Sequence, residues 1–572
     1  HDANAPLAER PWLRAYDPGV PATIDVPDEP LDTALATAAR HYPQRVAIRF
    51  FGRSITYREL DELANRFANA LIALGVQPGD RVALLMPNCP QMVFAYYGGL
   101  RAGAVMVPTS PLYSASELQH QLADAEARVV ICLSALFGQL QAVRPHLPAL
   151  EHVIVTNIKD FFPTTLRLLF TLSKERKDGH RVSLPSDGQT WWLNRLLSRA
   201  RTTDPGVPVG ADDLALLQYT GGTTGLAKGA MLTHRNLVAN TLQIRAWFAP
   251  LANPDGSEIV MGVLPLFHIY AMTTVMNFSI RGGGTMVLQP RFVLDDVLKG
   301  IHREKPHLLP GVPTMYMAIN HAPNLHRYNL RSLKGAISGA APLPREVQAQ
   351  FEDLTGARLI EGYGLTEASP VTHCSPLMGS PRPGSIGVPV PGTDAAIFDQ
   401  ETGQRRVEPG DIGELAVRGP QVMRGYWRRP DETAQVLRDG WLFTGDVARV
   451  DADGFFTVVD RKKDMIISGG MNVYPRDVEA PLFAHPKVKE AVAVGIPDER
   501  WGEAVKVYIV LRDGQSATEQ EMIDYCHARM ARYKVPKFVE FRRELPKTMV
   551  GKVLRRQLLQ EELARTAHRR AS

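Results

Sequence analysis

Apolar residues recur at helical spacing near the amino terminus. Five of them lie three or four residues apart: Leu60, Leu63, Phe67, Leu71 and Leu74. This spacing places side chains on one face of an α-helix. Thr56 and Glu59 precede the run in a capping-box pattern, and Gly75 follows at a position where helices commonly end. The pattern therefore predicts an amphipathic helix over residues 57–74.

Short apolar runs follow this helix at intervals. Residues 81–86, 104–107 and 129–132 are each rich in Val, Ala, Leu, Ile or Met. Runs of this length, without polar alternation, are typical of strands that are buried on both faces. Ser114 and Glu117 form a second capping-box pattern between two of the runs, which predicts another helix. Strands that alternate with helices indicate an α/β fold with helices on both faces of a parallel sheet.

The alternation ends at the charged run of residues 461–464, and a smaller α+β unit is predicted beyond it. Its predicted parts are a Gly-rich loop at 466–475, a helix from 476, strands at 488–494 and 505–510, a helix near 519–529 and a basic tail. Charged junctions between compact units are candidate linkers. We therefore expect a large N-terminal domain over residues 1–460, a linker at 461–464 and a small C-terminal domain over 465–572.

Composition limits the class of protein. A chain of 572 residues is too long for one hydrophobic core and indicates several domains. The net charge of +5 is mild and no basic run is concentrated, so nucleotides or a membrane surface suit this chain better than nucleic acid. The four cysteines are scattered, which predicts reduced, mostly buried thiols in a cytoplasmic protein. No signal-peptide pattern and no apolar run long enough to cross a bilayer is present in the sequence.

Residues 157–201 interrupt the regular alternation. They are rich in aromatic residues and leucine, beginning with Phe161 and Phe162, and carry several Lys and Arg residues. Such a segment can lie in a membrane interface, on the inner face of the cell membrane, or can pack on the protein itself or in a homodimer contact. The sequence leaves these alternatives open.

The stretch from Leu217 to Gly229 carries the strongest chemical signal. It reads Leu-Gln-Tyr-Thr-Gly-Gly-Thr-Thr-Gly-Leu-Ala-Lys-Gly, between an apolar run and a helix expected near Thr233. Glycines let backbone N–H groups turn toward an anion, hydroxyls add donors and a lysine adds charge, so a strand, loop and helix of this kind predict a phosphate site. The stretch is not a Walker A motif, because Lys228 is followed by Gly229 instead of Ser or Thr.

Two later stretches carry chemistry of the same kind. Small residues at 338–341 follow an apolar run and would let a flat base lie against the backbone. In the run Glu-Gly-Tyr-Gly-Leu-Thr-Glu at 361–367, Tyr363 can stack on a base and Thr366 can donate to phosphate. Glu367 offers the hard oxygen ligand that Mg²⁺ prefers.

Taken in order, these motifs resemble the adenylate-forming superfamily of acyl-CoA synthetases, peptide-synthetase adenylation domains and beetle luciferases. The usual signature is Tyr/Phe-Thr-Ser-Gly-Thr-Thr-Gly-x-Pro-Lys-Gly. This chain departs from it at Gly221 and Ala227, and both departures resemble bacterial long-chain fatty acyl-CoA synthetases. The resemblance runs from about Leu31 to the C-terminal tail. It implies an adenylate-forming fold, with a multi-subdomain α/β domain of parallel sheets and a mobile small domain.

The resemblance also implies a role for each matching residue. Lys552, Glu367, Thr220 and His268 would be catalytic, with His268 at the inner end of the acyl pocket, and Glu367 and Thr220 would hold Mg²⁺. Lys463 would be the hinge pivot, and Asp446 and Arg461 would bind ribose and phosphate. The remaining implied nucleotide and CoA contacts are Tyr219, Gly221, Gly222, Thr223, Thr224, Gly225, Lys228, Gly339, Ala340, Ala341, Glu361, Gly362, Tyr363, Gly364, Thr366, Gly469 and Gly470.

The implied activity has two steps and uses ATP, Mg²⁺ and CoA. A medium- or long-chain fatty acid would first form acyl-AMP, and CoA would then take the acyl group. The alternatives that share the first step are a peptide-synthetase adenylation domain, a luciferase and a ligase that acylates a carrier protein. A P-loop kinase is disfavoured by the missing Gly-Lys-Ser/Thr ending. A catalytically dead fatty-acid sensor is disfavoured by the intact acidic, threonine and lysine positions.

Overall fold

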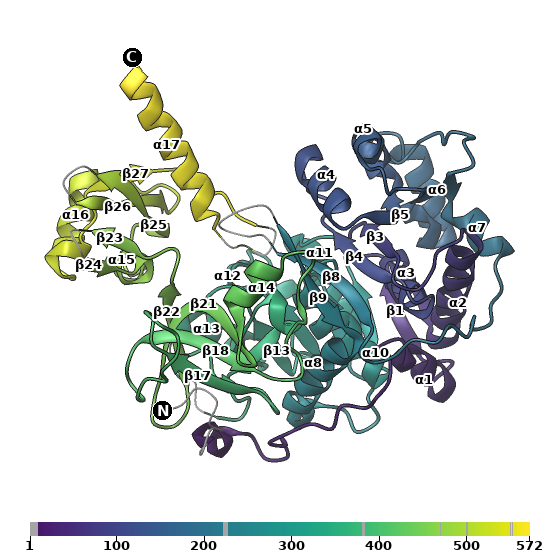
Figure 1. Cartoon of the computed structure of the whole chain (residues 1–572), viewed down its shortest axis with the longest axis horizontal. Helices are drawn as coiled ribbons and strands as arrows, with labels where there is room; N and C mark the ends of the chain where they lie inside the picture. Colours follow the sequence, from purple (N-terminus) through teal and green to yellow (C-terminus); the bar gives the residue numbers. More distant parts are fainter. Residues whose placement is uncertain are drawn as a thin grey trace.

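The computed structural model describes residues 10–220, 227–379, 382, 384–468, 471–498, 501–548, 551 and 553–571. Two large sheets with helices around them form most of the molecule, and a smaller unit stands beside them (Figure 1). No helix in these ranges is long and apolar enough to cross a membrane.

The first large sheet is mainly parallel and carries the predicted phosphate stretch. Within the described residues it has eight strands. In spatial order they are β19 (Gly425–Tyr426), β9 (Lys228–Thr233), β8 (Leu214–Thr220), β4 (Val105–Thr109), β3 (Arg81–Leu85), β5 (Ala127–Leu133), β6 (His152–Thr156) and β7 (Thr190–Trp192). The helices along this part of the chain are α1 (Thr33–His41), α2 (Tyr57–Ala73), α3 (Pro90–Arg101), α4 (Ala115–Asp124), α5 (Phe137–Val143), α6 (Thr164–Ser173), α7 (Leu193–Arg199) and α8 (His234–Trp247).

The second large sheet supplies the other half of the site. Its nine strands within the described ranges are β16 (Val388–Pro389), β15 (Val371–Cys374), β14 (Arg358–Gly364), β13 (Gly335–Ser338), β12 (Leu308–Gly311), β10 (Ile259–Gly262), β11 (Thr285–Leu288), β1 (Val46–Phe50) and β2 (Arg53–Thr56). Helices α9 (Ile269–Ala271), α10 (Phe278–Gly282), α11 (Leu294–Glu304), α12 (Pro313–Asn320) and α13 (Arg345–Thr355) accompany it.

A third sheet, which the sequence did not predict, leads to the small domain. It is antiparallel and consists of β17 (Asp394–Phe398), β18 (Gly413–Arg418), β21 (Trp441–Val450), β20 (Leu437–Arg438) and β22 (Phe456–Arg461). Helix α14 (Pro430–Val436) precedes β20. Strands β21 and β22 place Asp446 opposite Arg461. The chain therefore leaves this sheet directly at the predicted hinge.

The small domain is α+β, as predicted, and has its own apolar core. Its sheet contains β24 (Met471–Val473), β23 (Ile466–Ser468), β26 (Gly502–Leu511), β25 (Val488–Asp498) and β27 (Phe538–Phe541), and its helices are α15 (Pro475–Phe483), α16 (Glu519–His527) and α17 (Arg555–Ala571). One expectation was wrong in detail, since the predicted loop at 466–475 contains the paired strands β23 and β24. The predicted basic tail contains helix α17.

Local capping explains where several predicted helices begin. Ser114 and Glu117 form the complete capping box at the start of α4. At α2 only half of the box is present. Thr56 accepts a hydrogen bond from the Glu59 N–H, but the Glu59 carboxylate pairs with Arg53. One satisfied N–H is enough to fix the helix start, which lies within one residue of the prediction.

The predicted membrane segment divides into a buried part and an exposed part. Phe161 and Phe162 are buried in the core, which contradicts their interfacial interpretation. On α6, by contrast, three leucines point to solvent, with exposed fractions of 61% for Leu168, 62% for Leu169 and 77% for Leu172. Apolar side chains of one segment therefore have opposite environments. Phe161 and Phe162 precede α6 and are buried, whereas the three leucines lie on the exposed face of α6.

Candidate active site

The predicted phosphate stretch is a hairpin, not a strand that leads directly into a helix. Strand β9 runs antiparallel to β8 and pairs Thr220 with Lys228 and Leu214 with Thr233. Helix α8 begins after Thr233, its N-cap residue, at the opposite end of β8 from Thr220. The helix expected near Thr233 is therefore confirmed, but its N-terminus lies away from Thr220. An anion near Thr220 and Lys228 would therefore not lie at the N-terminus of α8.

Parallel strands β12, β13 and β14 end at one edge of the second sheet. They bring the predicted stretches at 338–341 and 361–367 together. Gly311 on β12 pairs with Ser338 on β13, which pairs with Glu361 on β14. The turn at 339–341 follows β13, and its Ala340 has a φ of 68°, which is uncommon for a residue with a Cβ. Gly364 has no room for a side chain, because a Cβ there would come 2.2 Å from the Pro370 carbonyl oxygen. The backbone at this edge is therefore closely fixed.

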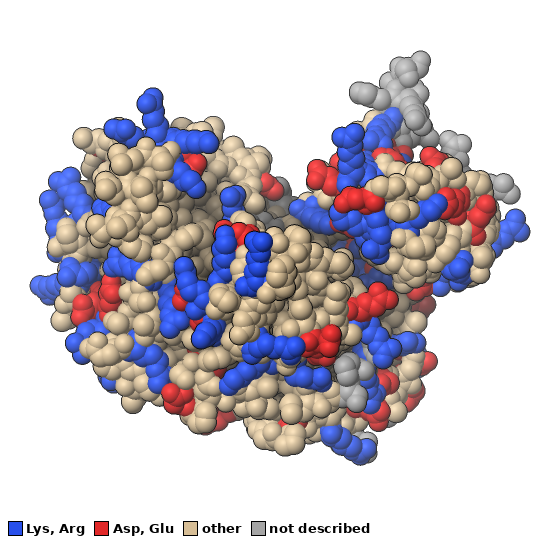
Figure 2. Space-filling view, turned by 180° about the vertical axis from the view of Figure 1, so that it is seen from behind, with Lys and Arg blue, Asp and Glu red and all other residues tan. Residues whose placement is uncertain are grey.

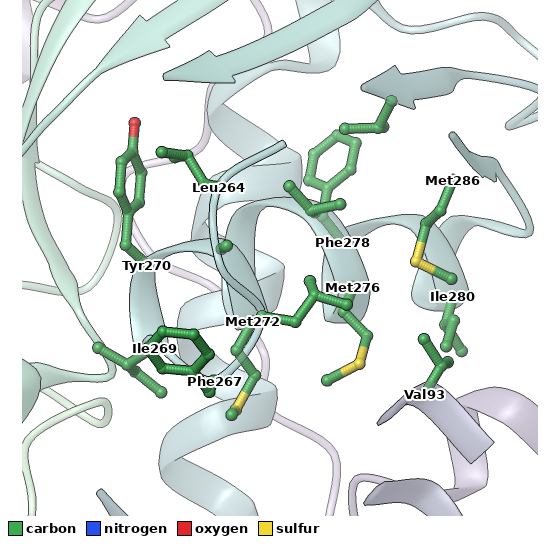
Figure 3. Close-up of a cluster of buried hydrophobic side chains, with 14 of the residues drawn as sticks. Val93, Leu264, Phe267, Ile269, Tyr270, Met272, Met276, Phe278, Ile280 and Met286 are labelled. Atoms are coloured by element: carbon green, nitrogen blue, oxygen red, sulfur yellow. The ribbon is translucent and has the colours of Figure 1, made fainter. Parts of the chain in front are cut away.

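The side chain of Tyr270 is hydrogen-bonded to two strands at this edge. Its hydroxyl donates to the carbonyls of Ile337 and Gly311 at 2.8 and 3.1 Å. Figure 3 shows that hydroxyl directed toward the strands, above the apolar cluster that includes Ile269 and Met272. His268 caps the same helix, since its Nδ1 accepts the Tyr270 N–H at 3.2 Å. This contact gives His268 a structural role beside the predicted acyl-pocket role.

Asp446 contacts both Tyr363 and Arg461, although Tyr363 and Arg461 lie 98 positions apart in the sequence. The Tyr363 hydroxyl donates to Asp446 Oδ2 at 2.5 Å, and Arg461 Nε lies 3.4 Å from Asp446 Oδ1. Burial raises the pKa of Tyr363 well above its ordinary value, and the neighbouring Asp446 raises it further. The phenol therefore stays neutral and is a hydrogen-bond donor to the carboxylate.

Glu367 lies in the short helical turn after β14, and its side chain contacts Tyr426 on β19. The Tyr426 hydroxyl donates to Glu367 Oε1 at 2.6 Å, and the Glu367 carbonyl accepts the Met423 N–H at 2.7 Å. Burial and the Glu367 carboxylate raise the pKa of Tyr426. The Tyr426 ring also lies 5.1 Å from Lys228 Nζ. Tyr426 thus connects the predicted metal ligand to the predicted phosphate lysine.

Glu361 has an unusual environment within the same edge. Its Oε2 accepts the Leu343 N–H at 3.2 Å. Burial raises the pKa of the Glu361 carboxyl to about 7, and Arg476 of the small domain opposes that rise. The carboxyl group is consequently bonded to the residue that follows the predicted base-binding turn and senses the charge of Arg476.

The small domain contacts this edge through its C-terminal segment. Gly551 lies against Thr314 on α12, since a Cβ added to Gly551 would come 3.1 Å from Thr314 Oγ1. Burial and the nearby Arg461 lower the pKa of Lys463, while Asp464, Asp446 and Glu367 favour its charged form. The predicted pivot therefore lies among the site's own charges. Figure 2 shows a hollow between the large body and the small domain.

Several predicted residues cannot be placed. Gly221, Gly222, Thr223, Thr224, Gly225, Gly469, Gly470 and Lys552 lie outside the described residues. Of the others, the structure brings together Thr220 with Lys228, Tyr363 with Asp446 and Arg461, and Glu367 with Tyr426. Tyr219 points elsewhere, because its hydroxyl donates to Asp124 Oδ2 at 2.7 Å.

Among the described residues, no group of three or more His, Cys, Asp or Glu side chains could hold a metal ion by itself. This does not conflict with a Mg²⁺ role for Glu367, because Mg²⁺ is commonly held by one or two carboxylates, water and substrate phosphates. Glu367 Oε1 is occupied by Tyr426, which leaves Oε2 as the oxygen suited to a cation. The four cysteines are buried and free, as predicted.

Comparison with known proteins defines the class. Residues 35–427 match the AMP-binding enzyme family, and residues 477–552 match the AMP-binding enzyme C-terminal domain. The first match covers more than half of the chain, so this protein belongs to the AMP-binding enzyme family.

Two individual relatives are similar to this chain over most of its length. The chain is 45% identical over 557 residues to a long-chain-fatty-acid–CoA ligase of Bacillus subtilis, covering 97% of this chain and 98% of the relative. It is also 40% identical over 520 residues to a feruloyl-CoA synthase of Amycolatopsis, covering 90% of this chain and 96% of the relative.

A solved structure bears on the arrangement of the two domains. MatB from Rhodopseudomonas palustris is 30% identical to this chain, with 93% of this chain and 99% of MatB covered. The TM-score is 0.80 for ATP-bound MatB and 0.70 for apo MatB. This chain is therefore more similar in overall arrangement to the ATP-bound form.

Proposed function

We propose that this protein is a long-chain-fatty-acid–CoA ligase that converts a fatty acid, ATP and CoA into acyl-CoA, AMP and pyrophosphate. The observation that carries the proposal is the full-length similarity to the Bacillus ligase, together with the predicted nucleotide residues on one sheet edge. The name of the feruloyl-CoA synthase relative indicates the same class of reaction with a different acid. Sequence similarity therefore supports the formation of a CoA thioester more strongly than it supports a particular acid substrate.

In the first step a carboxylate oxygen of the fatty acid bonds to the α-phosphorus of ATP, and pyrophosphate leaves. Both reactants are anions, so the main demand on the protein is charge neutralisation and in-line positioning. Lys228 and Thr220 would contact the β- and γ-phosphates, while Asp446 would accept the ribose hydroxyls. Mg²⁺ held by Glu367, with Thr220 beside it, would supply positive charge to the phosphates.

In the second step the CoA sulfur bonds to the acyl carbon, AMP leaves and the thiol proton passes to solvent. This step needs a different position of the small domain, which we propose to rotate about residues 461–464. The contact between Gly551 and Thr314 and the higher similarity to ATP-bound MatB support assignment of the present arrangement to the first step.

We expect the purified protein to form acyl-CoA from ATP, Mg²⁺, CoA and a long-chain fatty acid, with one AMP released for each thioester. A panel from acetate to oleate, with ferulate added, would measure the acid preference by thioester yield, with boiled protein as control. Release of ADP and phosphate in place of AMP and pyrophosphate would contradict adenylation. A carrier protein accepted in place of CoA would assign the chain to the alternative ligase class.

We further propose peripheral binding to anionic membranes through the outer face of α6. Leu168, Leu169 and Leu172 are exposed there, and Lys174, Arg176 and Lys177 follow the helix. Leucines can enter the acyl boundary while basic side chains contact lipid phosphates. Full burial of one leucine contributes about 1.5–3 kcal/mol. Homodimer formation through this face would compete with lipid.

Replacement of Leu168, Leu169 and Leu172 by Ser should weaken sedimentation with anionic vesicles at least about tenfold, since three apolar contacts are lost. Activity on a short-chain acid in solution should be unchanged. Leu112→Ser and Met378→Ser, at exposed positions in other loops, are the matched controls. Equal sedimentation of the triple variant and wild type would show that α6 does not bind lipid.

A further inference from the structure

The predicted phosphate lysine has an acidic partner that the sequence did not indicate. Lys228 Nζ forms an ion pair with Glu432, which lies in the first turn of α14. Arg429, one turn earlier, is 3.6 Å from Glu432 and 3.0 Å from Asp124. The pair is partly open to solvent, with exposed side-chain fractions of 24% for Lys228 and 34% for Glu432. Solvent and anions can therefore reach it.

Glu432 and a phosphate group would require the same ammonium group. Lys228 begins β9 directly opposite Thr220, the last described residue before residues 221–226 of the phosphate stretch. A phosphate that contacts Lys228 here would meet the carboxylate of Glu432 at close range, and two anions repel each other. The ring of Tyr426 limits the alternative positions of the lysine from one side. A phosphate would therefore compete with Glu432 for Lys228.

The neighbouring acid offers a natural comparison. Asp431 lies in the same helical turn and is exposed. In the described part of the chain it has no ion pair or hydrogen bond to Lys228, whose acidic partner is Glu432. Loss of either charge changes the general field to a similar extent, but only loss of Glu432 removes the direct competitor.

We propose that Glu432 is a residue of the pyrophosphate subsite and acts as a competing counter-ion for Lys228. It weakens the contact between Lys228 and the β- and γ-phosphates, and pairs again with Lys228 as pyrophosphate leaves. Glu432 makes no covalent bond and acts through Lys228, so it is a positioning residue. The inference rests on the proposed adenylation function and adds a residue that sets pyrophosphate affinity.

The test compares Glu432→Gln with Asp431→Asn in the full chain. Titration with inorganic pyrophosphate and Mg²⁺, followed by calorimetry, should give about three- to fivefold tighter binding for Glu432→Gln, the range expected for loss of an exposed ion pair. The KM for ATP should fall and product inhibition by pyrophosphate should strengthen. Asp431→Asn should bind pyrophosphate like wild type.

A double-mutant cycle makes the test specific. In a Lys228→Met background, Glu432→Gln should gain no more pyrophosphate affinity than Asp431→Asn does, because the lysine for which Glu432 competes is absent and only general repulsion between anions remains. Equal affinity of Glu432→Gln and wild type, weaker binding, or the same gain in Asp431→Asn would overturn the inference. A wild-type protein that neither binds pyrophosphate nor forms acyl-AMP would instead contradict the proposed function.

Discussion

Replacement of Lys552 by Ala is expected to slow acyl-AMP formation from ATP by at least about a hundredfold, or about 2.7 kcal/mol in the transition state. The family resemblance places this lysine between the fatty carboxylate and the α-phosphate, where negative charges meet. Its neighbour Gly551 lies against Thr314, beside the edge formed by β12 and β13. Transfer of pre-made acyl-AMP to CoA should keep nearly its normal rate, because that step uses another domain position.

The two half-reactions can be measured separately. Pyrophosphate release from ATP and fatty acid reports the first, and thioester formation from acyl-AMP and CoA reports the second. Lys547→Ala is the matched control, since Lys547 lies in the same segment but pairs with Glu490 inside the small domain. If Lys552→Ala slows both reactions equally, the lysine serves both states or is structural.

Lys463→Pro should give the opposite result in the same experiment. Proline fixes φ near −65° and would restrict rotation at the proposed pivot. The present arrangement, which we assign to the first step, would still form acyl-AMP, whereas thioester formation would stall. Domain rotation about a few residues is a known class of conformational change. A Lys463→Pro variant with normal rates in both steps would place the pivot elsewhere.

Local patterns predicted the elements whose signals lie within a few residues of one another. The apolar runs gave β3, β4 and β5, and the polar caps gave α2 and α4. Strand β9 was not predicted, because Lys228 and Gly229 have little preference for strands and its pairing with β8 and β19 is a tertiary contact. The start of α8 near Thr233 was predicted correctly, but the antiparallel strand before it was missed.

The candidate site shows the same limit at the level of side chains. The motifs indicated Tyr363, Glu367 and Asp446 individually, but no spacing rule indicates that Tyr363 donates to Asp446, 83 residues away. Tyr426 and Glu432 carried no signal at all, since an aromatic and an acid in a polar run are typical of any surface segment. Only the packing of α14 and β19 against β9 brings them to Lys228.

Glu367→Gln is expected to reduce adenylation by a hundredfold or more, because an amide lacks the charge that a hard divalent cation requires. The hydrogen bond from Tyr426 would persist with the amide oxygen, so the loss should come from the charge and not from the fold. Tyr426→Phe should act more weakly, as it removes only the donor that orients the carboxylate. The diagnostic measurement is the rate of pyrophosphate release against Mg²⁺ concentration.

Both variants should require more Mg²⁺ for half-maximal rate, and Glu367→Gln should not recover fully at saturating Mg²⁺. Glu346→Gln, on the exposed first turn of α13, controls for loss of one negative charge and should behave like wild type. Retained near-ultraviolet circular dichroism would exclude unfolding as the cause. Normal turnover of Glu367→Gln with an unchanged Mg²⁺ dependence would mean that the cation is held elsewhere, and Tyr426 would then be a packing residue of β19.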